Sequence, residues 1–315
     1  MDDTLESSRL IVVVGPTASG KSDLAQEIAR ELNGCVLSAD SMQIYRGMDI
    51  GTGKLLSHEQ YVPHYGLDLA DPGESYSVAV FQEYGRKLID EQLAMGKAVV
   101  VCGGTGFYIR ALIDEFDFPA GNQDDNPVRE KYSRLLEEIG PHALWEELKR
   151  VDPASAEVVH ENDTKRVIRA FELLADGTSY NKQKEAFQKI PQHYPATFIG
   201  LKVEPAILNA RIDRRVDKMV AAGLVEEVRG LLSQGLREGL TAQYAIGYKE
   251  IVAYLDGECS LEEAIASIKI STHRYAKRQR TWFRKDLRIH WISADEYDLS
   301  RLTRQSLDII EKVSH

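Results

Sequence analysis

The stretch Leu10–Ser22, with the sequence LIVVVGPTASGKS, decides the fold of this 315-residue chain. Its first five residues are apolar and mostly β-branched, which predicts a buried strand, and residues 23–32 have the apolar spacing of a helix. Between them, Gly15–Ser22 matches the pattern GxxxxGK followed by Ser or Thr. This order of strand, pattern and helix predicts a P-loop, in which backbone N–H groups and a helix N-terminus surround phosphate oxygens.

The residue types in this loop each have a chemical role. Glycine permits the tight backbone path, Lys21 places a full positive charge between two phosphates, and the Ser22 hydroxyl is a candidate ligand for Mg²⁺. The predicted contacts to phosphate or pyrophosphate are Gly15, Pro16, Thr17, Ala18, Ser19, Gly20, Lys21 and Ser22. The loop alone does not distinguish ATP from another polyphosphate or pyrophosphate ligand.

Outward from the loop, strand and helix patterns alternate. Apolar runs at 35–39 and 98–102 predict two further strands, and Ser77 is a suitable N-cap for an amphipathic helix that ends near Met95. Such alternation predicts an α/β fold of the P-loop NTPase type, in which helices flank a parallel sheet.

The pattern changes after Phe116, where a stretch rich in Pro, Asp and Asn begins. From about 129 to 187 only helical patterns occur, and an apolar strand resumes at Thr197. We therefore expect a P-loop α/β core formed by residues 1–116 and 197–315, with an all-helical insertion domain at 117–196.

The composition indicates a globular protein of the cytoplasm. Hydrophobic residues make up 43% and charged residues 28% of the chain. The apolar run at the start has five residues, whereas a membrane helix needs about 20, and the first nine residues do not resemble a secretory or transit peptide. The three cysteines are far apart and have no zinc-site or disulfide spacing. We expect no membrane association.

The charge of the chain is segregated. The net charge is −10, yet residues 269–288 contain eight Lys or Arg and one acid. His273, Tyr275, Trp282 and Phe283 are interleaved with these bases. Bases and aromatic residues together favour contact with nucleic acid, so we expect the arginines to face RNA and the aromatic residues to serve mainly in packing.

Five motifs, read in order, resemble the tRNA dimethylallyltransferase family, also called tRNA isopentenyltransferases. They are GPTASGKS at 15–22, SADSMQIY at 38–45, MDIGTG at 48–53, GGTGFY at 103–108 and AIGYKE at 245–250. The resemblance extends from about Leu10 to Ile292 and fits the short bacterial form, because no zinc-finger spacing follows the core.

The resemblance implies the reaction and its catalytic residues. The donor is dimethylallyl pyrophosphate, and the acceptor is N6 of the adenosine 3′-adjacent to the anticodon of tRNA. Asp40 is the implied general base, Thr105 the donor to the leaving oxygen, and Arg215, with Lys21 and Mg²⁺, the cation for the pyrophosphate. Three of these residues also have a possible non-catalytic role. Asp40 and Thr105 could be helix caps, and Arg215 could lie on a solvated helix face.

The resemblance also implies that the α/β core is the catalytic domain, that the insertion at 117–196 is a tRNA-binding domain, and that the chain has an RNA surface. Gln43 can read the adenine through its amide, and Lys165 and Arg169 share one helix face, which in most proteins is simply solvated. The predicted tRNA contacts are Asp40, Ser41, Met42, Gln43, Thr105, Arg129, Lys165, Arg166, Val167, Ile168, Arg169, Lys277, Arg278 and Arg280.

Three other functions remain open at this point. A small-molecule P-loop kinase explains the loop but not the basic segment, and a prenyltransferase acting on free AMP needs neither that segment nor the insertion. An RNA-binding protein with a vestigial loop conflicts with the intact Lys21 and Ser22. We expect a monomer.

Overall fold

A computed structural model describes residues 9–116 and 126–313. The chain forms two compact units, one from Met1–Asp114 with Gln192–His315 and the other from Glu115–Pro191. The predicted insertion covers residues 117–196, and the first residues of this range, 117–125, lie outside the described part.

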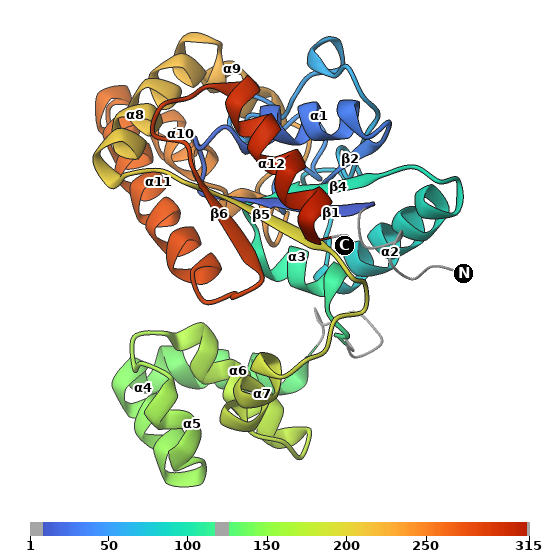
Figure 1. Cartoon of the computed structure of the whole chain (residues 1–315). Helices are drawn as coiled ribbons and strands as arrows, with labels where there is room; N and C mark the ends of the chain where they lie inside the picture. The colour runs from blue at the N-terminus through green and yellow to red at the C-terminus, as the bar shows by residue number, and fades with distance from the viewer. Residues whose placement is uncertain (1–8, 117–125, 314–315) are drawn as a thin grey trace. The chain divides into compact units, whose positions relative to one another are not determined.

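The larger unit is built on one sheet of six parallel strands in the order β3-β2-β4-β1-β5-β6 (Figure 1). The strands are β1 (Leu10–Val14), β2 (Cys35–Ser38), β3 (His64–Tyr65), β4 (Val99–Gly103), β5 (Thr197–Lys202) and β6 (Ile289–Ser293). Every residue of β1, β2 and β4 is buried, because helices cover both faces of a parallel sheet. The predicted P-loop α/β class is confirmed.

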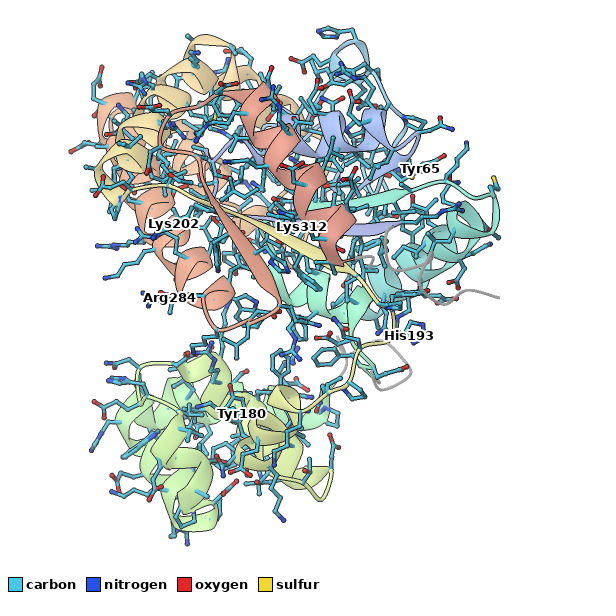
Figure 2. All side chains as sticks on the ribbon, viewed as in Figure 1. Tyr65, Tyr180, His193, Lys202, Arg284 and Lys312 are labelled. Atoms are coloured by element: carbon cyan, nitrogen blue, oxygen red, sulfur yellow. The ribbon has the colours of Figure 1, made fainter. Side chains whose placement is uncertain are left out.

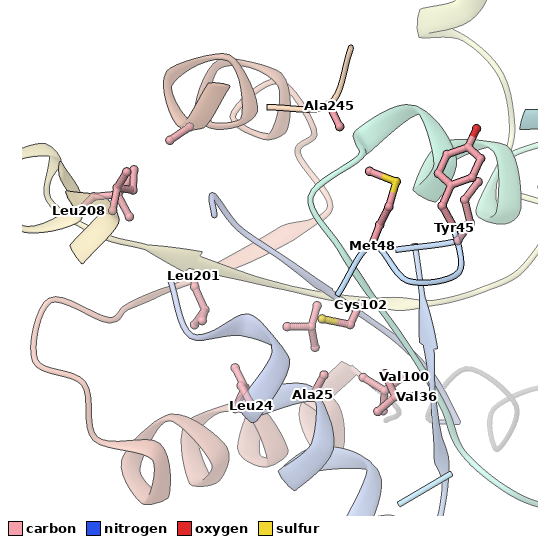
Figure 3. Close-up of a cluster of buried hydrophobic side chains, with 14 of the residues drawn as sticks. Leu24, Ala25, Val36, Tyr45, Met48, Val100, Cys102, Leu201, Leu208 and Ala245 are labelled. Carbon is pink, nitrogen blue, oxygen red and sulfur yellow. The ribbon is translucent and has the colours of Figure 1, made fainter. Parts of the chain in front are cut away.

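Eight helices belong to this unit where the structure describes it. They are α1 (Lys21–Glu31), α2 (Val78–Ala94), α3 (Gly106–Ile113), α8 (Pro205–Ala221), α9 (Leu224–Leu232), α10 (Tyr248–Leu255), α11 (Leu261–Phe283) and α12 (Leu299–Val313), with short 3₁₀ turns at Ser57–Glu59 and Ala242–Tyr244. Two apolar clusters fill the space between sheet and helices. In one, Leu24 and Ala25 of α1 lie close to Val36, Val100 and Cys102 of the neighbouring strands (Figure 3).

The smaller unit contains four described helices, α4 (Pro127–Val151), α5 (Pro153–Val158), α6 (Thr164–Ala175) and α7 (Tyr180–Gln188). The side chains of Asn126, Asp152, Asp163 and Ser179 cap them in that order. Gly140, with φ of 80°, interrupts α4 just before Pro141. Leu144, Leu148 and Phe171 form part of an apolar core of its own. The helical character of this unit agrees with the helical patterns read at about 129 to 187.

None of the described helices is long and apolar enough to cross a membrane.

Candidate active site

The P-loop connects β1 to α1 with the backbone geometry that its glycines permit. Ala18 and Gly20 have φ of 62° and 89°, in the left-handed region that favours glycine. At Gly20 a Cβ would also lie 2.2 Å from the Tyr297 ring. The loop ends at Lys21, the first residue of α1, so the helix N-terminus adjoins it.

A cavity of about 320 Å³ opens beside the loop, at the carboxyl ends of the central strands, which is the usual ligand edge of such a sheet. Its polar lining includes Lys21, Ser22, Asp40 and Arg215. The apolar lining includes Ile212, Val216, Met219, Leu224, Ile246 and Ile268. One cavity therefore offers contacts to an anion and to an apolar group.

Lys21 and Arg215 place two cations at this cavity. Burial lowers the pKa of both side chains, while the Asp40 carboxylate opposes that shift in each. Arg215 donates from Nη2 to the Thr52 carbonyl at 3.1 Å. It lies on the same face of α8 as Ile212 and Val216, which also line the cavity, so the alternative of a solvated face is wrong. Two cations held in a partly dry site favour a polyanion such as pyrophosphate.

Asp40 follows β2 and lines the cavity. Its Oδ1 accepts a hydrogen bond from the Met42 N–H at 3.0 Å. Residues 41–44 form a turn and not a helix, so the helix-cap alternative is wrong and the bond closes a turn. That bond uses one oxygen of the carboxylate. The other oxygen remains for a substrate proton, so this turn bond and a role as general base are compatible.

Thr105 precedes α3 but its side chain does not cap that helix. Instead, Oγ1 accepts from the Ser41 N–H at 3.2 Å and lies 3.4 Å from the Ser41 hydroxyl. Tyr275 also lines the cavity, and burial raises the pKa of its hydroxyl. The structure thus joins Thr105 to the residue beside Asp40 and excludes the capping alternative.

Hydrogen bonds to other residues of the protein hold the Gln43 side chain in place. Its Oε1 accepts from the Ser38 hydroxyl at 2.8 Å, and its Nε2 donates to the carbonyls of Thr52 and Gly53, both at 3.4 Å. The amide orientation is therefore fixed, and a role in reading adenine requires exchange of one of these bonds. Ser41, Met42 and Gln43 all line the cavity.

Gln279 is a site residue that the sequence analysis missed. It lies on α11 and is 4% exposed. Its Oε1 accepts from the Thr17 N–H of the P-loop at 2.8 Å, and its Nε2 donates to the Gly104 carbonyl at 3.0 Å. Its spacing in the sequence could have indicated that it is buried, because Gln279 shares one face of the helix with the buried Ala276 and Phe283.

The basic segment at 269–288 divides into two groups. Lys269 pairs with Asp217 at 2.7 Å, and Arg288 pairs with Asp114 and Asp286, each at 2.6 Å. These two bases therefore support the fold.

The other bases of the segment are largely accessible. The exposed ones are Arg274, Lys277, Arg278, Arg284 and Lys285, and Arg280 is half-buried. Arg284 projects just after the end of α11 (Figure 2).

Of the aromatic residues in this segment, Phe283 is buried as expected. Trp282 is 39% exposed, and a Cβ at Gly106 would lie 2.0 Å from its indole nitrogen. Its assignment to the core is therefore wrong: the ring covers a glycine and keeps one side accessible.

In the helical unit, the predicted RNA contacts have different environments. Arg129 and Arg169 both donate to Glu172, whose carboxylate is buried, at 2.6 and 2.8 Å. Val167 and Ile168 are 0% and 8% exposed. Their side chains belong to the core of the unit, so including them among direct RNA contacts was wrong.

Two predicted RNA contacts of this unit are on its surface. Lys165 and Arg166 are exposed. Arg166 pairs with Asp163 at 2.6 Å, and an exposed pair of this kind has little strength.

The fold and the cavity define a P-loop enzyme whose site suits a substrate with a polyanionic part and an apolar part. Residues 43–286 match the family model described as IPP transferase, and residues 8–62 match that described as isopentenyl transferase. The chain therefore belongs to the IPP transferase family, and the resemblance read from the five motifs is confirmed.

Relatives and solved structures agree with this family. The tRNA dimethylallyltransferase of Carboxydothermus hydrogenoformans is 44% identical over 302 residues, covering 95% of this chain and 96% of that relative. The tRNA isopentenylpyrophosphate transferase of Bacillus halodurans superposes with a TM-score of 0.71 at 39% identity over 98% of each chain. A eukaryotic dimethylallyltransferase acting on tRNA gives a TM-score of 0.78 at 28% identity, covering 96% of this chain and 80% of that one.

Proposed function

We propose that this chain transfers the dimethylallyl group of dimethylallyl pyrophosphate to N6 of the adenosine 3′-adjacent to the anticodon of tRNA. A C–N bond forms at N6, the C–O bond to pyrophosphate breaks, and one N6 proton is lost. The observation that carries the proposal is the single cavity that brings Lys21 and Arg215 together with the Asp40 carboxylate and an apolar lining.

The pyrophosphate leaves with negative charge developing on its bridging oxygen. Lys21 and Arg215 are placed to neutralise that charge, and Thr105, held beside Asp40 through Ser41, is the donor to the leaving oxygen. Because these cations are already in place before substrate binds, little reorganisation is needed during the reaction.

The Ser22 hydroxyl fits the requirements of Mg²⁺. It lines the cavity next to Lys21, and Mg²⁺ commonly binds one or two protein oxygens together with substrate phosphates and water. No cluster of three or more His, Cys, Asp or Glu able to hold a metal occurs among the described residues, which suits a metal held chiefly by pyrophosphate. Such an ion would supply further charge neutralisation to the leaving group.

Asp40 acts as the general base. An exocyclic amine is a weak nucleophile, and a carboxylate that accepts its proton as the C–N bond forms lowers the barrier. The bond from the Met42 N–H to Oδ1 orients the carboxylate. A loop adenine can be flipped out of its stack and carried to a cavity of this kind.

The tRNA is bound through the exposed bases of both units. On the core these include Lys277 and Arg278, and on the helical unit Lys165 and Arg166. We place the reaction in the cytoplasm and expect the enzyme to act as a monomer.

The test is a pair of substitutions at Asp40. Asp40→Asn keeps an oxygen that can accept from the Met42 N–H but removes the base, whereas Asp40→Ala removes both. Both variants should bind tRNA within about 3-fold of wild type and lose transfer by about 10²- to 10⁴-fold. If Asp40→Asn transfers at the wild-type rate, Asp40 is not the base. If both variants instead lose tRNA binding and transfer normally per bound complex, its role is in recognition.

A further inference from the structure

Three successive backbone N–H groups converge on one carboxylate from a distant helix. They belong to Asp49, Ile50 and Gly51, in a loop that we define as residues 48–53. Oε2 of Glu227, on α9, accepts from the N–H of Asp49 at 3.2 Å and of Ile50 at 2.7 Å, and Oε1 accepts from the N–H of Gly51 at 3.1 Å. Consecutive N–H groups arranged in this way form an anion-binding concavity, and here the anion is a side chain of the protein itself.

Tyr248 completes the cluster. Its hydroxyl donates to Oε1 of Glu227 at 2.7 Å, and its ring packs so closely on the loop that a Cβ at Gly51 would lie 2.5 Å from it. Each carboxylate oxygen of Glu227 therefore accepts two hydrogen bonds. Bonds to a charged acceptor are stronger than neutral ones, so this carboxylate fixes the path of the loop.

The carbonyl groups of the same loop hold two side chains of the cavity. The Thr52 carbonyl accepts from Nη2 of Arg215 at 3.1 Å and from Nε2 of Gln43 at 3.4 Å, and the Gly53 carbonyl accepts from Gln43 at 3.4 Å. A Cβ at Gly53 would lie 2.0 Å from Nη2 of Arg215. A small displacement of the loop therefore moves both side chains.

We propose that Glu227 is a positioning residue for the transfer reaction, acting through residues 48–53 on Arg215 and Gln43. The inference rests on the proposed function, because it gives Arg215 the pyrophosphate and Gln43 the adenine. Glu227 is not among the residues that line the cavity. Its effect is transmitted by the loop, whose N–H groups bind Glu227 and whose carbonyls orient the two cavity side chains.

The informative variant is Glu227→Gln, which keeps the shape but sets an NH₂ group against N–H donors. The loop retains a second anchor, because Nζ of Lys54 donates to Oδ1 of Asp49 at 2.7 Å, so the fold should survive. Glu226→Gln is the matched control: this neighbour is 70% exposed in its side chain and pairs only with Arg229 among the described residues.

Binding of inorganic pyrophosphate with Mg²⁺, measured by calorimetry, gives the readout. Glu227→Gln should weaken it by about 10- to 100-fold, as residues that orient a ligand-binding group commonly do. In an Arg215→Ala background, Glu227→Gln should weaken pyrophosphate binding by no more than about 2-fold, because the guanidinium that Glu227 positions is absent. Glu226→Gln should bind as wild type does. Equal losses with and without Arg215 would overturn the inference, since a purely structural role gives additive effects.

The outcome for this inference is separable from that for the proposed function. Wild-type protein that binds pyrophosphate but transfers no dimethylallyl group would refute the function, while the coupling between Glu227 and Arg215 would still be read from pyrophosphate binding. If Glu227→Gln fails to fold, Tyr248→Phe removes one of the four donors. It should weaken pyrophosphate binding by about 3-fold, again only when Arg215 is present; no coupling there would also overturn the inference.

Discussion

Gln279→Leu tests whether α11 holds the P-loop in shape. The substitution keeps most of the side-chain volume but removes the acceptor for the Thr17 N–H and the donor to the Gly104 carbonyl. Both backbone groups then lose their partner. A buried polar group left without one costs about 1–3 kcal/mol, and the Thr17 bond is only partly buried. We therefore expect a local cost of about 2–4 kcal/mol for the two groups together.

Hydrogen exchange and ligand binding measure that cost where it arises. The Thr17 amide should exchange about 30- to 700-fold faster in Gln279→Leu, since about 1.4 kcal/mol corresponds to a factor of ten. Binding of Mg²⁺-pyrophosphate should weaken by a similar factor, because the ligand must reorder the loop. Global unfolding is a poorer assay, since a chain with two compact units need not unfold in one step.

Thr281→Leu provides the matched control. Thr281 is exposed on the same helix and bonds only locally, to the Lys277 carbonyl. This variant should exchange and bind as wild type does. Unchanged exchange at Thr17 together with unchanged pyrophosphate binding in Gln279→Leu would refute the reasoning, since the loop would then keep its shape without the amide of Gln279.

Three further predictions follow from the packing. Glu172→Gln should destabilise the helical unit by about 1–3 kcal/mol, because it weakens two hydrogen bonds to a charged acceptor, while the partly exposed arginines that remain keep contact with water. Burial alone raises the pKa of Glu172, but those arginines lower it. Its contribution is therefore present above the usual pKa of 4.5 and is lost as pH falls below it, as thermal denaturation against pH would show. Gly53→Ala should raise the KM for dimethylallyl pyrophosphate at least 10-fold, because the new Cβ overlaps Arg215; an unchanged KM would show that this arginine moves aside freely. Lys165→Glu with Arg166→Glu should weaken tRNA binding and flatten its dependence on salt, whereas equal salt slopes for variant and wild type would remove this surface from the RNA interface.

Most of the sheet could be predicted because buried parallel strands are continuous apolar runs. Leu10–Val14 and Val99–Gly103 are of this kind. Strand β3 has two half-buried residues, His64 and Tyr65, and such a short segment carries no periodicity. Helix α10 begins only at Tyr248, because Gly247, with φ of 96°, ends the preceding turn.

The site could be predicted where its chemistry is local in sequence. The P-loop has its glycines, lysine and serine within eight residues. Gln279 and Glu227 act on backbone groups 262 and 176 to 178 residues away, and a contact with a backbone amide leaves no pattern in the partner's sequence. Arg169 was predicted to contact RNA because it lies among other basic residues. The same sequence is equally compatible with its ion pair to the buried Glu172, three residues later.

Transfer of the dimethylallyl group to tRNA can be measured in a single labelling experiment. Dimethylallyl pyrophosphate labelled in its alkyl group is incubated with the protein, Mg²⁺ and unmodified tRNA, alongside reactions with AMP and with no acceptor. The account predicts label on N6 of the adenosine 3′-adjacent to the anticodon, with release of pyrophosphate. Label on AMP alone would make the chain a free-nucleotide prenyltransferase. No labelled product, together with phosphate transfer from ATP to a metabolite, would contradict the account and indicate a kinase.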